Sequence, residues 1–540
     1  MRKVSPTHKI RRVFRKRDSS FHPRNKSYKW WLLANVMIGT FMAVLDATIV
    51  NVGLPKIMSS FGVGLDKIEW VITAYMLAMA VMLPTAGWLA DKFGYKRIYF
   101  LGLMLFTVGS FLCGMSGDEN ILILSRIIQG LGAGAIQPIG MAIITREFPP
   151  HQRGVALGFW AISAAASVSF GPLIGGYLVD NFSWQLIFDV NVPVGILGLL
   201  ATVIIQKEYI NKKIRSFDYV GFISVSLFLP LVLYALTEGN AATNTAGWHA
   251  PYVLICFAIS AITLVIFIIT ELNIKEPLID LKLLKNHNFG LANLIIFIFS
   301  VGMFGSTFLL PMYLQNSLGY TAIQSGAVFL PVGIIQGMMS PIAGLLSNKI
   351  DAKIPIVIGV VVLAISFYLN TFLSPLTEHS YIMISLYLRG FAMGLLFTPL
   401  STVSLSEVPR EKMAQASGIS NIVRQLAGSF GVAVLATLLS TRMLYHQQIY
   451  SQSIDSKSQT YKNITANIAS NIEHTAGSSH SMAVRQSQAL VVSYVNREAY
   501  IAGIDDDFMI AGLVTFIGII PIFWLHTKKK KTESLQKYGS

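Results

Sequence analysis

Long apolar runs alternate with short polar connections along most of the chain. A membrane-spanning helix needs roughly 20 mainly apolar residues, because the hydrocarbon core of a bilayer is about 30 Å thick. The runs that meet this requirement are residues 30–52, 69–89, 98–116, 121–144, 154–178, 184–206, 218–236, 250–271, 289–313, 324–347, 353–374, 380–402, 415–441 and 499–525. The pattern therefore predicts fourteen membrane spans. Because this number is even, both chain ends are expected on the same side of the membrane.

The chain also resembles itself at an offset of 260 residues. The matched positions are Glu147-Phe148-Pro149 with Glu407-Val408-Pro409, Gly158 with Gly418, and Ser169-Phe170-Gly171 with Ser429-Phe430-Gly431. Arg126 and Arg389 lie at similar places in spans 4 and 12. A shared offset predicts two six-helix bundles with spans 7 and 8 inserted between them. Parallel repeats of this kind are typical of transporters whose halves rock about a central site.

Composition supports this class of protein. Hydrophobic residues make up 53% of the chain and charged residues 13%, whereas soluble domains average about 25% charged residues. The expected fold is an all-α polytopic membrane protein. Its predicted parts are a basic tail (1–29), a first bundle (30–206), two inserted helices with their loops (207–288), a second bundle (289–525) and a second basic tail (526–540).

The net charge of +15 lies mostly at the chain ends and in alternate loops. Eleven of the first 29 residues are Lys or Arg, and Lys528–Lys531 form a run in the C-terminal tail. Basic residues near membrane spans favour the cytoplasmic side. We therefore expect both termini in the cytoplasm, with the basic residues facing the anionic leaflet of the bilayer rather than a nucleic acid.

Residues 442–498 interrupt the apolar pattern before the last span. They are rich in Ser, Gln, Asn and Thr. We expect a long, partly ordered surface loop on the outer side, with residues 481–495 as a possible helix. A protein partner for this loop is unknown from the sequence.

The sequence offers no sign of an enzyme. There is no Walker A sequence, no nucleophile elbow and no His/Glu cluster, and the two cysteines both fall in apolar runs. The expectation is therefore a protein without cofactor or metal. The expected energy source is the proton gradient rather than ATP.

Span 5 carries an unusual group of helix-breaking residues, Gly171, Pro172, Gly175 and Gly176. Proline inside a helix removes a hydrogen bond, and glycine lets another backbone approach closely. Neighbouring helices can satisfy the freed carbonyl in a membrane bundle. The pattern predicts a kinked, tightly packed helix, as expected in a transporter that must move.

Several stretches resemble the major facilitator superfamily, and more narrowly its fourteen-span branch of drug:proton antiporters. They are residues 45–55 in span 1 (LDATIVNVGLP), 87–97 between spans 2 and 3 (GWLADKFGYKR), 126–134 in span 4 (RIIQGLGAG), 171–176 in span 5 (GPLIGG) and 184–193 (WQLIFDVNVP). Gly53 stands where the branch usually has Ala, and Asp189 where it usually has an apolar residue. The resemblance covers the whole chain and implies the two-bundle fold, with residues 171–176 as the antiporter motif.

Three ionisable residues of the first bundle lie at depth. At 1.5 Å per residue, Asp46 lies roughly 24 Å along span 1, and Arg126 lies about 8 Å from the outer end of span 4. Asp189 is similarly shallow in span 6, so all three lie in the outer half of the membrane. Ionisable groups there usually face a cavity or one another. We predict Asp46 as the proton-coupling carboxylate, Arg126 as its partner, and Asp189 as a second carboxylate for a proton or a cationic substrate.

Structural alternatives remain open for these residues. Asp46 and Arg126 can form a static pair that locks spans 1 and 4, and Asp189 can lie at the surface near the lipid headgroups. The loop between spans 2 and 3 is expected to act as a conformational gate through Gly87, Asp91, Gly94, Arg97 and Arg153. Asp91 is expected to cap a helix N-terminus or to pair with Arg153. A purely topological role for the basic residues of this loop is equally open.

The expected function is proton-coupled export of hydrophobic or cationic small molecules, that is, multidrug efflux by alternating access. The expected partners of the protein are the substrate, protons and the lipid bilayer, and a nucleic acid is not expected. The expected location is the plasma membrane of a bacterium. One alternative is export of a lipid, fatty acid or other cell-made metabolite; another is a receptor or assembly factor acting through residues 442–498. Uptake by symport is disfavoured by the span 5 motif.

Overall fold

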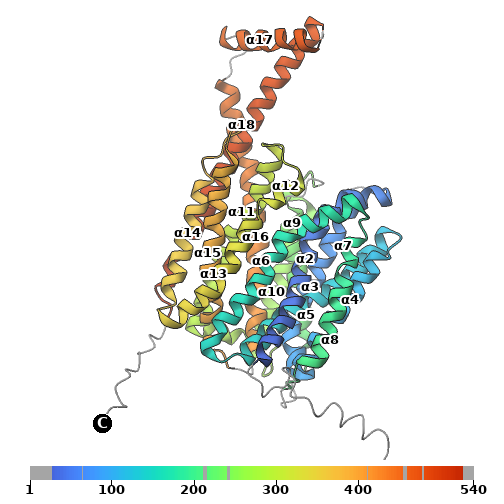
Figure 1. Ribbon diagram of the computed structural model, residues 1–540, viewed down its shortest axis with the longest axis vertical. Coiled ribbons are helices and arrows are strands. Elements are labelled where there is room, and N and C mark those ends of the chain that lie inside the picture. The colour runs from blue at the N-terminus through green and yellow to red at the C-terminus, as the bar shows by residue number, and fades with distance from the viewer. Residues whose placement is uncertain are drawn as a thin grey trace, which may run out of the picture.

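The computed structural model describes residues 27–63, 65–210, 216–239, 244–409, 412–453, 459–476 and 479–526. Within these ranges the chain folds into helices and contains no strand (Figure 1). The expectation of an all-α fold is confirmed for this part of the chain. The predicted basic tails, 1–29 and 526–540, lie almost entirely outside the described residues.

The helices follow the predicted order of two bundles and an insert (Figure 1). The first bundle contains α2 (Tyr28–Phe61), α3 (Leu65–Phe93), α4 (Tyr95–Gly114), α5 (Glu119–Glu147), α6 (Pro150–Asn181), α7 (Leu186–Asp189) and α8 (Asn191–Ile205). The insert contains α9 (Tyr219–Glu238) and α10 (Pro251–Asn273). The second bundle contains α11 (His287–Asn316), α12 (Ala322–Ala327), α13 (Leu330–Lys349), α14 (Lys353–Leu369), α15 (His379–Ser406), α16 (Met413–Ser453), α18 (His480–Ile517) and α19 (Ile519–Ile522).

Each of the fourteen predicted spans coincides with helix. Eleven stretches of the described chain are long and apolar enough to cross a membrane. The remaining three predicted spans correspond to α6, α14 and α18; α14 is a shorter apolar helix of 17 residues. The apolar pattern therefore located the helices correctly, although it did not locate their ends.

Three predicted spans are interrupted helices rather than single ones. Span 6 is divided into α7 and α8, span 10 into α12 and α13, and span 14 into α18 and α19. Pro193 lies in the first turn of α8 and Pro331 in the first turn of α13. Proline lacks the backbone N–H that would continue a preceding helix, but it suits the first turn of a new one.

The two bundles meet through two equivalent pairs of helices, α6 with α13 and α16 with α3. The repeat-related glycines lie at these contacts. A Cβ on Gly158 of α6 would lie 2.7 Å from the backbone of Ser340, and one on Gly418 of α16 would lie 3.5 Å from the carbonyl of Leu83. The self-resemblance of the sequence thus corresponds to a pseudo-symmetric interface.

The described part of the chain begins at Ser27 and ends at His526 on the same side of the bundle, which we call the terminal side (Figure 1). The bundles are tightly packed there. A Cβ on Gly154 would lie 2.9 Å from the carbonyl oxygen of Gly344, and one on Gly87 would lie 3.2 Å from the backbone of Ala414. The two bundles therefore approach each other backbone to backbone at this side.

The predicted surface loop 442–498 is instead mostly helical. The helix α16 continues to Ser453, α17 spans Gln459–Ala476, and α18 already begins at His480. Figure 1 shows this helical hairpin projecting beyond the bundle on the side opposite the termini, which we call the hairpin side. The helix expected at residues 481–495 is confirmed as part of α18. The other described residues of this segment are also mostly helical, because polar composition excludes a membrane span but does not exclude a solvent-exposed helix.

Candidate functional site

A buried ion pair lies at the centre of the first bundle. Arg126 of α5 donates a hydrogen bond from Nη1 to Oδ2 of Asp46 on α2. The Asp46 side chain is 0% exposed and that of Arg126 is 1% exposed. Two of the three residues predicted from the sequence thus lie in direct contact, shielded from water.

Three further polar residues extend the pair into a network. Gln129, one turn after Arg126, accepts from Arg126 Nη1 at 2.7 Å and donates to Asp46 Oδ1 at 2.7 Å. Asn191 at the start of α8 donates to the same Oδ1 at 3.2 Å. Both amides also donate to the Ser110 hydroxyl of α4, at 3.1 Å each. The Asp46 carboxylate therefore accepts hydrogen bonds from three side chains on two other helices.

The arginine is fixed from its other side by α3. Arg126 Nε donates to the carbonyl of Val71 at 2.9 Å, and its guanidinium lies 4.1 Å from the centroid of the Tyr75 ring. The Tyr75 hydroxyl donates to the carbonyl of Ala43 at 3.0 Å. Helices α2, α3, α4, α5 and α8 thus all contribute to holding one charge pair.

The Asp46 carboxylate accepts hydrogen bonds from three donors, one of which is the Arg126 cation, and hydrogen bonds between charged groups are the strong ones. In this conformation the Asp46 side chain is 0% exposed and so is closed off from solvent. A coupling role therefore requires another conformation in which the network opens. A locking role requires only the conformation seen here.

The structure does not bring Asp189 into this network. Asp189 ends the short helix α7 and is half-buried. Its carboxylate lies against Gly114 at the hairpin-side end of α4, where a Cβ on that glycine would collide with it. Its neighbour Phe188 does reach the site, since the Phe188 carbonyl accepts from Ser110 at 2.9 Å and its ring lies 5.7 Å from the Arg126 guanidinium.

Sequence reasoning did not assign roles to Gln129, Asn191 and Ser110. Gln129 carried a usable signal, because residues three apart on a helix share a face and Gln129 follows Arg126 at that spacing. Asn191 and Ser110 carried no comparable signal. Only the break between α7 and α8 and the packing of α4 place them beside Asp46.

The predicted gate lies on the terminal side. Asp91 is buried in the last turn of α3 and accepts a hydrogen bond from the Tyr95 hydroxyl at 2.9 Å. Asp91 does not cap α4, whose N-cap residue is Gly94. Capping of another helix by Asp91 and its pairing with Arg153 stay predictions. Arg153 of α6 is buried and donates from Nε to the Phe148 carbonyl at 3.2 Å.

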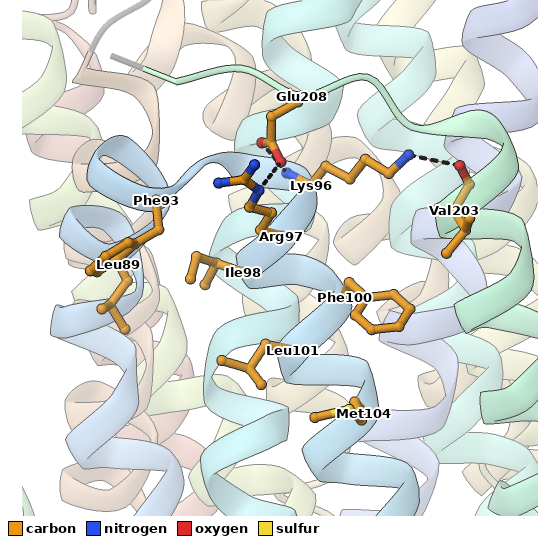
Figure 2. A pocket seen from close by; sticks show the side chains of 10 residues that line it. All are labelled: Leu89, Phe93, Lys96, Arg97, Ile98, Phe100, Leu101, Met104, Val203 and Glu208. Carbon is orange, nitrogen blue, oxygen red and sulfur yellow. Dashed lines mark hydrogen bonds and ion pairs between the residues drawn. The ribbon is translucent and has the colours of Figure 1, made fainter. Parts of the chain in front are cut away.

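The turn between α3 and α4 depends on Gly94, whose φ of 107° is a conformation that other residues rarely adopt. The segment after α8 closes over this turn, as Figure 2 shows. Glu208 accepts from the backbone N–H of Lys96 at 3.1 Å and pairs with Arg97 Nε at 3.5 Å. Lys96 Nζ donates to the Val203 carbonyl at 2.7 Å. Arg97 therefore ties the turn to its own bundle rather than to the other one.

A groove of about 680 Å³ lies beside this turn (Figure 2). Its walls are mainly apolar, from α3, α4 and α8, and Leu101 and Met104 within it are largely exposed. It lies on the outer surface of the first bundle. It therefore belongs to the lipid-facing surface and not to the interface between the bundles.

The span 5 motif lies in α6, which is continuous from Pro150 to Asn181. Added side chains at Gly171 and Gly175 would collide with Thr48 and Ile49 of α2, and one at Gly176 would collide with Ile323 of α12. These glycines let α6 pack closely against both bundles at once. Pro172 is part of the same helix.

Two six-helix bundles with a two-helix insert, and a charge pair buried within the membrane spans, define a polytopic membrane transporter. The chain belongs to the Major Facilitator Superfamily, whose family model matches residues 36–432.

Two relatives cover most of the chain. The multidrug export protein EmrB of Escherichia coli (strain K12) is 33% identical over 77% of this chain and 81% of that protein. The fatty acid resistance protein FarB of Neisseria gonorrhoeae is 30% identical over 92% of this chain and 95% of that protein. The predicted family and fold are therefore confirmed.

A solved structure shows the same fold. The crystal structure of the human organic anion transporter MFSD10 (TETRAN) aligns with a TM-score of 0.60 at 13% sequence identity, covering 92% of this chain and 99% of that one. At this identity the similarity concerns the fold alone.

Proposed function

We propose that this protein is a proton-coupled exporter of hydrophobic small molecules, with Asp46 as the carboxylate that carries the proton. The observation that supports this most strongly is the Asp46–Arg126 pair, which is fully buried in a membrane bundle and whose Asp46 carboxylate also accepts hydrogen bonds from two neutral amides. Ionisable groups at such depth usually serve transport. The relation to EmrB favours multidrug cargo.

In this proposal the conformation described above holds Asp46 ionised beside Arg126. Rocking of the bundles opens the hairpin side, separates the network, and lets a proton from outside replace Arg126 on Asp46. The glycine contacts between α6 and α13 and between α3 and α16 form the surfaces on which the bundles tilt. Moving one charge through 100 mV releases about 2.3 kcal/mol, so one proton per cycle can drive a substantial gradient of a neutral substrate.

Transport in proteoliposomes with an imposed pH gradient tests the proposal. The wild-type protein should move a hydrophobic dye against its gradient only when the proton gradient is present. Asp46→Asn should insert normally and lose gradient-driven transport. Asp118→Asn is the matched control, because Asp118 caps the exposed N-terminus of α5 and Asn is an equally good capping residue.

A double variant separates coupling from locking. If the pair only locks α2 to α5, Asp46→Asn with Arg126→Gln removes both charges and should restore transport. If Asp46 carries the proton, the double variant should fold better than either single variant and still fail to couple. Restored gradient-driven transport in the double variant would contradict the proposal.

Export of a fatty acid or another amphipathic metabolite is the second candidate, favoured by the relation to FarB. It retains the mechanism and changes the cargo. Comparing dye efflux with the resistance of cells to long-chain fatty acids, with and without the gene, distinguishes the two.

The orientation follows from the distribution of basic residues. We place the terminal side in the cytoplasm and the hairpin side outside, in the plasma membrane of a bacterium. The alternative function is that the hairpin formed by α16, α17 and α18 binds a partner protein on the outer side. Deleting residues 454–478 and joining the two helices with a short turn tests that role, because an exporter should retain dye efflux without them.

A further inference from the structure

A second constellation of side chains lies where the two bundles meet. It contains Thr40 on α2, Trp160 on α6, Phe397 on α15 and Arg424 on α16. Trp160 Nε1 donates to the Thr40 hydroxyl at 2.8 Å, and the Trp160 and Phe397 rings stack with centroids 6.1 Å apart. The Arg424 guanidinium lies 4.5 Å from the centroid of the Phe397 ring. The four residues thus form a continuous chain of contacts from the first bundle to the second.

These four side chains lie near the middle of the membrane. At 1.5 Å per residue, the four side chains lie between about 13 and 18 Å from the terminal-side ends of their helices. Phe397 packs against the apolar cores of both bundles, so it lies between them. Transporters with two repeated bundles bind substrate at this depth and at this interface. The Asp46 network lies nearer the hairpin side.

Arg424 differs from Arg126 in having no counter-ion. The side chain is half-buried, and its Nε is buried without an acceptor. No hydrogen bond or ion pair joins Arg424 to any other residue within the described ranges; its recorded contact is with the Phe397 ring. A cation in a membrane protein is usually paired, because an uncompensated charge at this depth is unfavourable. The site therefore has an unused positive charge beside the Phe397 ring, on which the Trp160 ring stacks.

We propose that Arg424 binds the acidic group of the transported molecule, so that the preferred cargo is an amphipathic organic anion. The guanidinium can donate two parallel hydrogen bonds to a carboxylate or sulfonate. Trp160 and Phe397 supply apolar surface for the attached hydrocarbon part. A lipophilic cation would meet like charge at the same place. This inference rests on the proposed export function and specifies its substrate.

Competing transport assays in proteoliposomes test the inference. The probes are a fluorescent long-chain alkyl sulfonate, which does not cross a bilayer unaided, and tetraphenylphosphonium, a permanent lipophilic cation. The variants are Arg424→Gln and Arg424→Lys. Arg442→Gln is the matched control, because Arg442 lies on the same helix but is 44% exposed and pairs with Asp506 beyond the bundle interface.

The wild-type protein should prefer the sulfonate. Arg424→Gln should lower the ratio of sulfonate to cation transport by about tenfold or more, mainly through a higher KM for the sulfonate. Arg424→Lys should recover part of that ratio, and Arg442→Gln should leave it unchanged.

Two results would overturn the inference. One is an unchanged ratio in Arg424→Gln. The other is an equal loss of both transport activities in a variant that still elutes as a folded monodisperse protein, since a structural role predicts equal loss. If the wild-type protein moves neither probe under a proton gradient, the proposed export function itself fails, and that outcome is separate from a change in the ratio.

Discussion

Arg126 and Arg389 occupy corresponding helices of the two bundles, yet within the described ranges Arg126 has a counter-ion and Arg389 has none. Both side chains are 1% exposed, and both lie over an aromatic ring, Tyr75 at 4.1 Å and Phe367 at 5.0 Å. Arg126 hydrogen-bonds to Asp46, Gln129 and the Val71 carbonyl. None of the three guanidinium nitrogens of Arg389 has a hydrogen-bond partner among the described residues.

The missing partner of Arg389 is explained by one position of the repeat. Arg389 lies 263 positions after Arg126, whereas the repeat at residues 147–171 has an offset of 260. The positions that these two offsets give for Asp46 are Leu309 (46 + 263 = 309) and Ser306 (46 + 260 = 306), and neither residue is acidic. The second bundle has thus kept the cation without the carboxylate. Among the described residues, a fully buried ion pair is found in the first bundle and not in the second, so proton handling is expected in the first bundle and substrate recognition can use the second.

The largest expected difference is in stability when each arginine is removed. Arg126→Met leaves the Asp46 carboxylate buried and unpaired, which should lower the free energy of unfolding by about 3–5 kcal/mol. Arg389→Met removes a buried charge that has no partner, so it should be neutral or stabilising. Thermal unfolding of both variants in detergent measures the difference. Equal destabilisation would show that Arg389 has an ionic partner in solution.

A smaller difference is expected at the two interface glycines. Gly158→Ala places a Cβ 2.7 Å from the backbone of Ser340, whereas Gly418→Ala places one 3.5 Å from the carbonyl of Leu83. Overpacking of this kind costs about 1–3 kcal/mol, so Gly158→Ala should slow turnover and Gly418→Ala should be tolerated. Gradient-driven dye transport compares them. Gly117→Ala is the control, because its added methyl group meets nothing within 4 Å.

A smaller loss of stability is expected when a hydrogen bond around Asp46 is removed. Gln129→Leu removes a donor to Asp46 and an acceptor for Arg126, while the ion pair remains. The free energy of unfolding should fall by about 1–2 kcal/mol, less than for Arg126→Met. Chemical or thermal unfolding of Gln129→Leu and Arg126→Met side by side shows which variant loses more free energy of unfolding. A greater loss for Gln129→Leu would mean that the amide, not the charge pair, holds the five helices together.

The smallest effect is expected at Asp507 of α18. This carboxylate is 0% exposed, and neither oxygen has a hydrogen-bond donor among the described residues. Asp507→Asn should change the free energy of unfolding by no more than about 1 kcal/mol and leave proton-driven transport intact. Loss of proton-driven transport in this variant would contradict the assignment of proton handling to the first bundle, because it would show a proton carrier in the second bundle.

Much of the fold was predictable from the sequence, because its causes are local. Apolar runs of membrane-spanning length located all fourteen predicted spans, and the offset of 260 residues identified the two bundles. The helical hairpin was not predictable, because a polar helix outside the membrane leaves no apolar pattern. The division of spans 6 and 10 depended on prolines whose effect varies with their position in the turn.

The candidate site was predictable only in part. Depth and charge indicated Asp46 and Arg126, which do meet. The same argument grouped Asp189 with them, but distance along a helix says nothing about the face on which a side chain lies. The contacts of Asn191 with Asp46 and of Glu208 with Lys96 were not predictable, because a turn and not helical spacing brings each pair together. The roles assigned to these residues remain predictions.

Infrared difference spectroscopy of the protein in lipid tests the central claim most directly, because a protonated carboxyl group has its own C=O stretching band. Between alkaline and acidic buffer, the wild-type protein and Asp507→Asn should both gain a band from a buried protonated carboxyl, and Asp46→Asn should lack it. A band that persists unchanged in Asp46→Asn would contradict the assignment of Asp46 as the proton carrier.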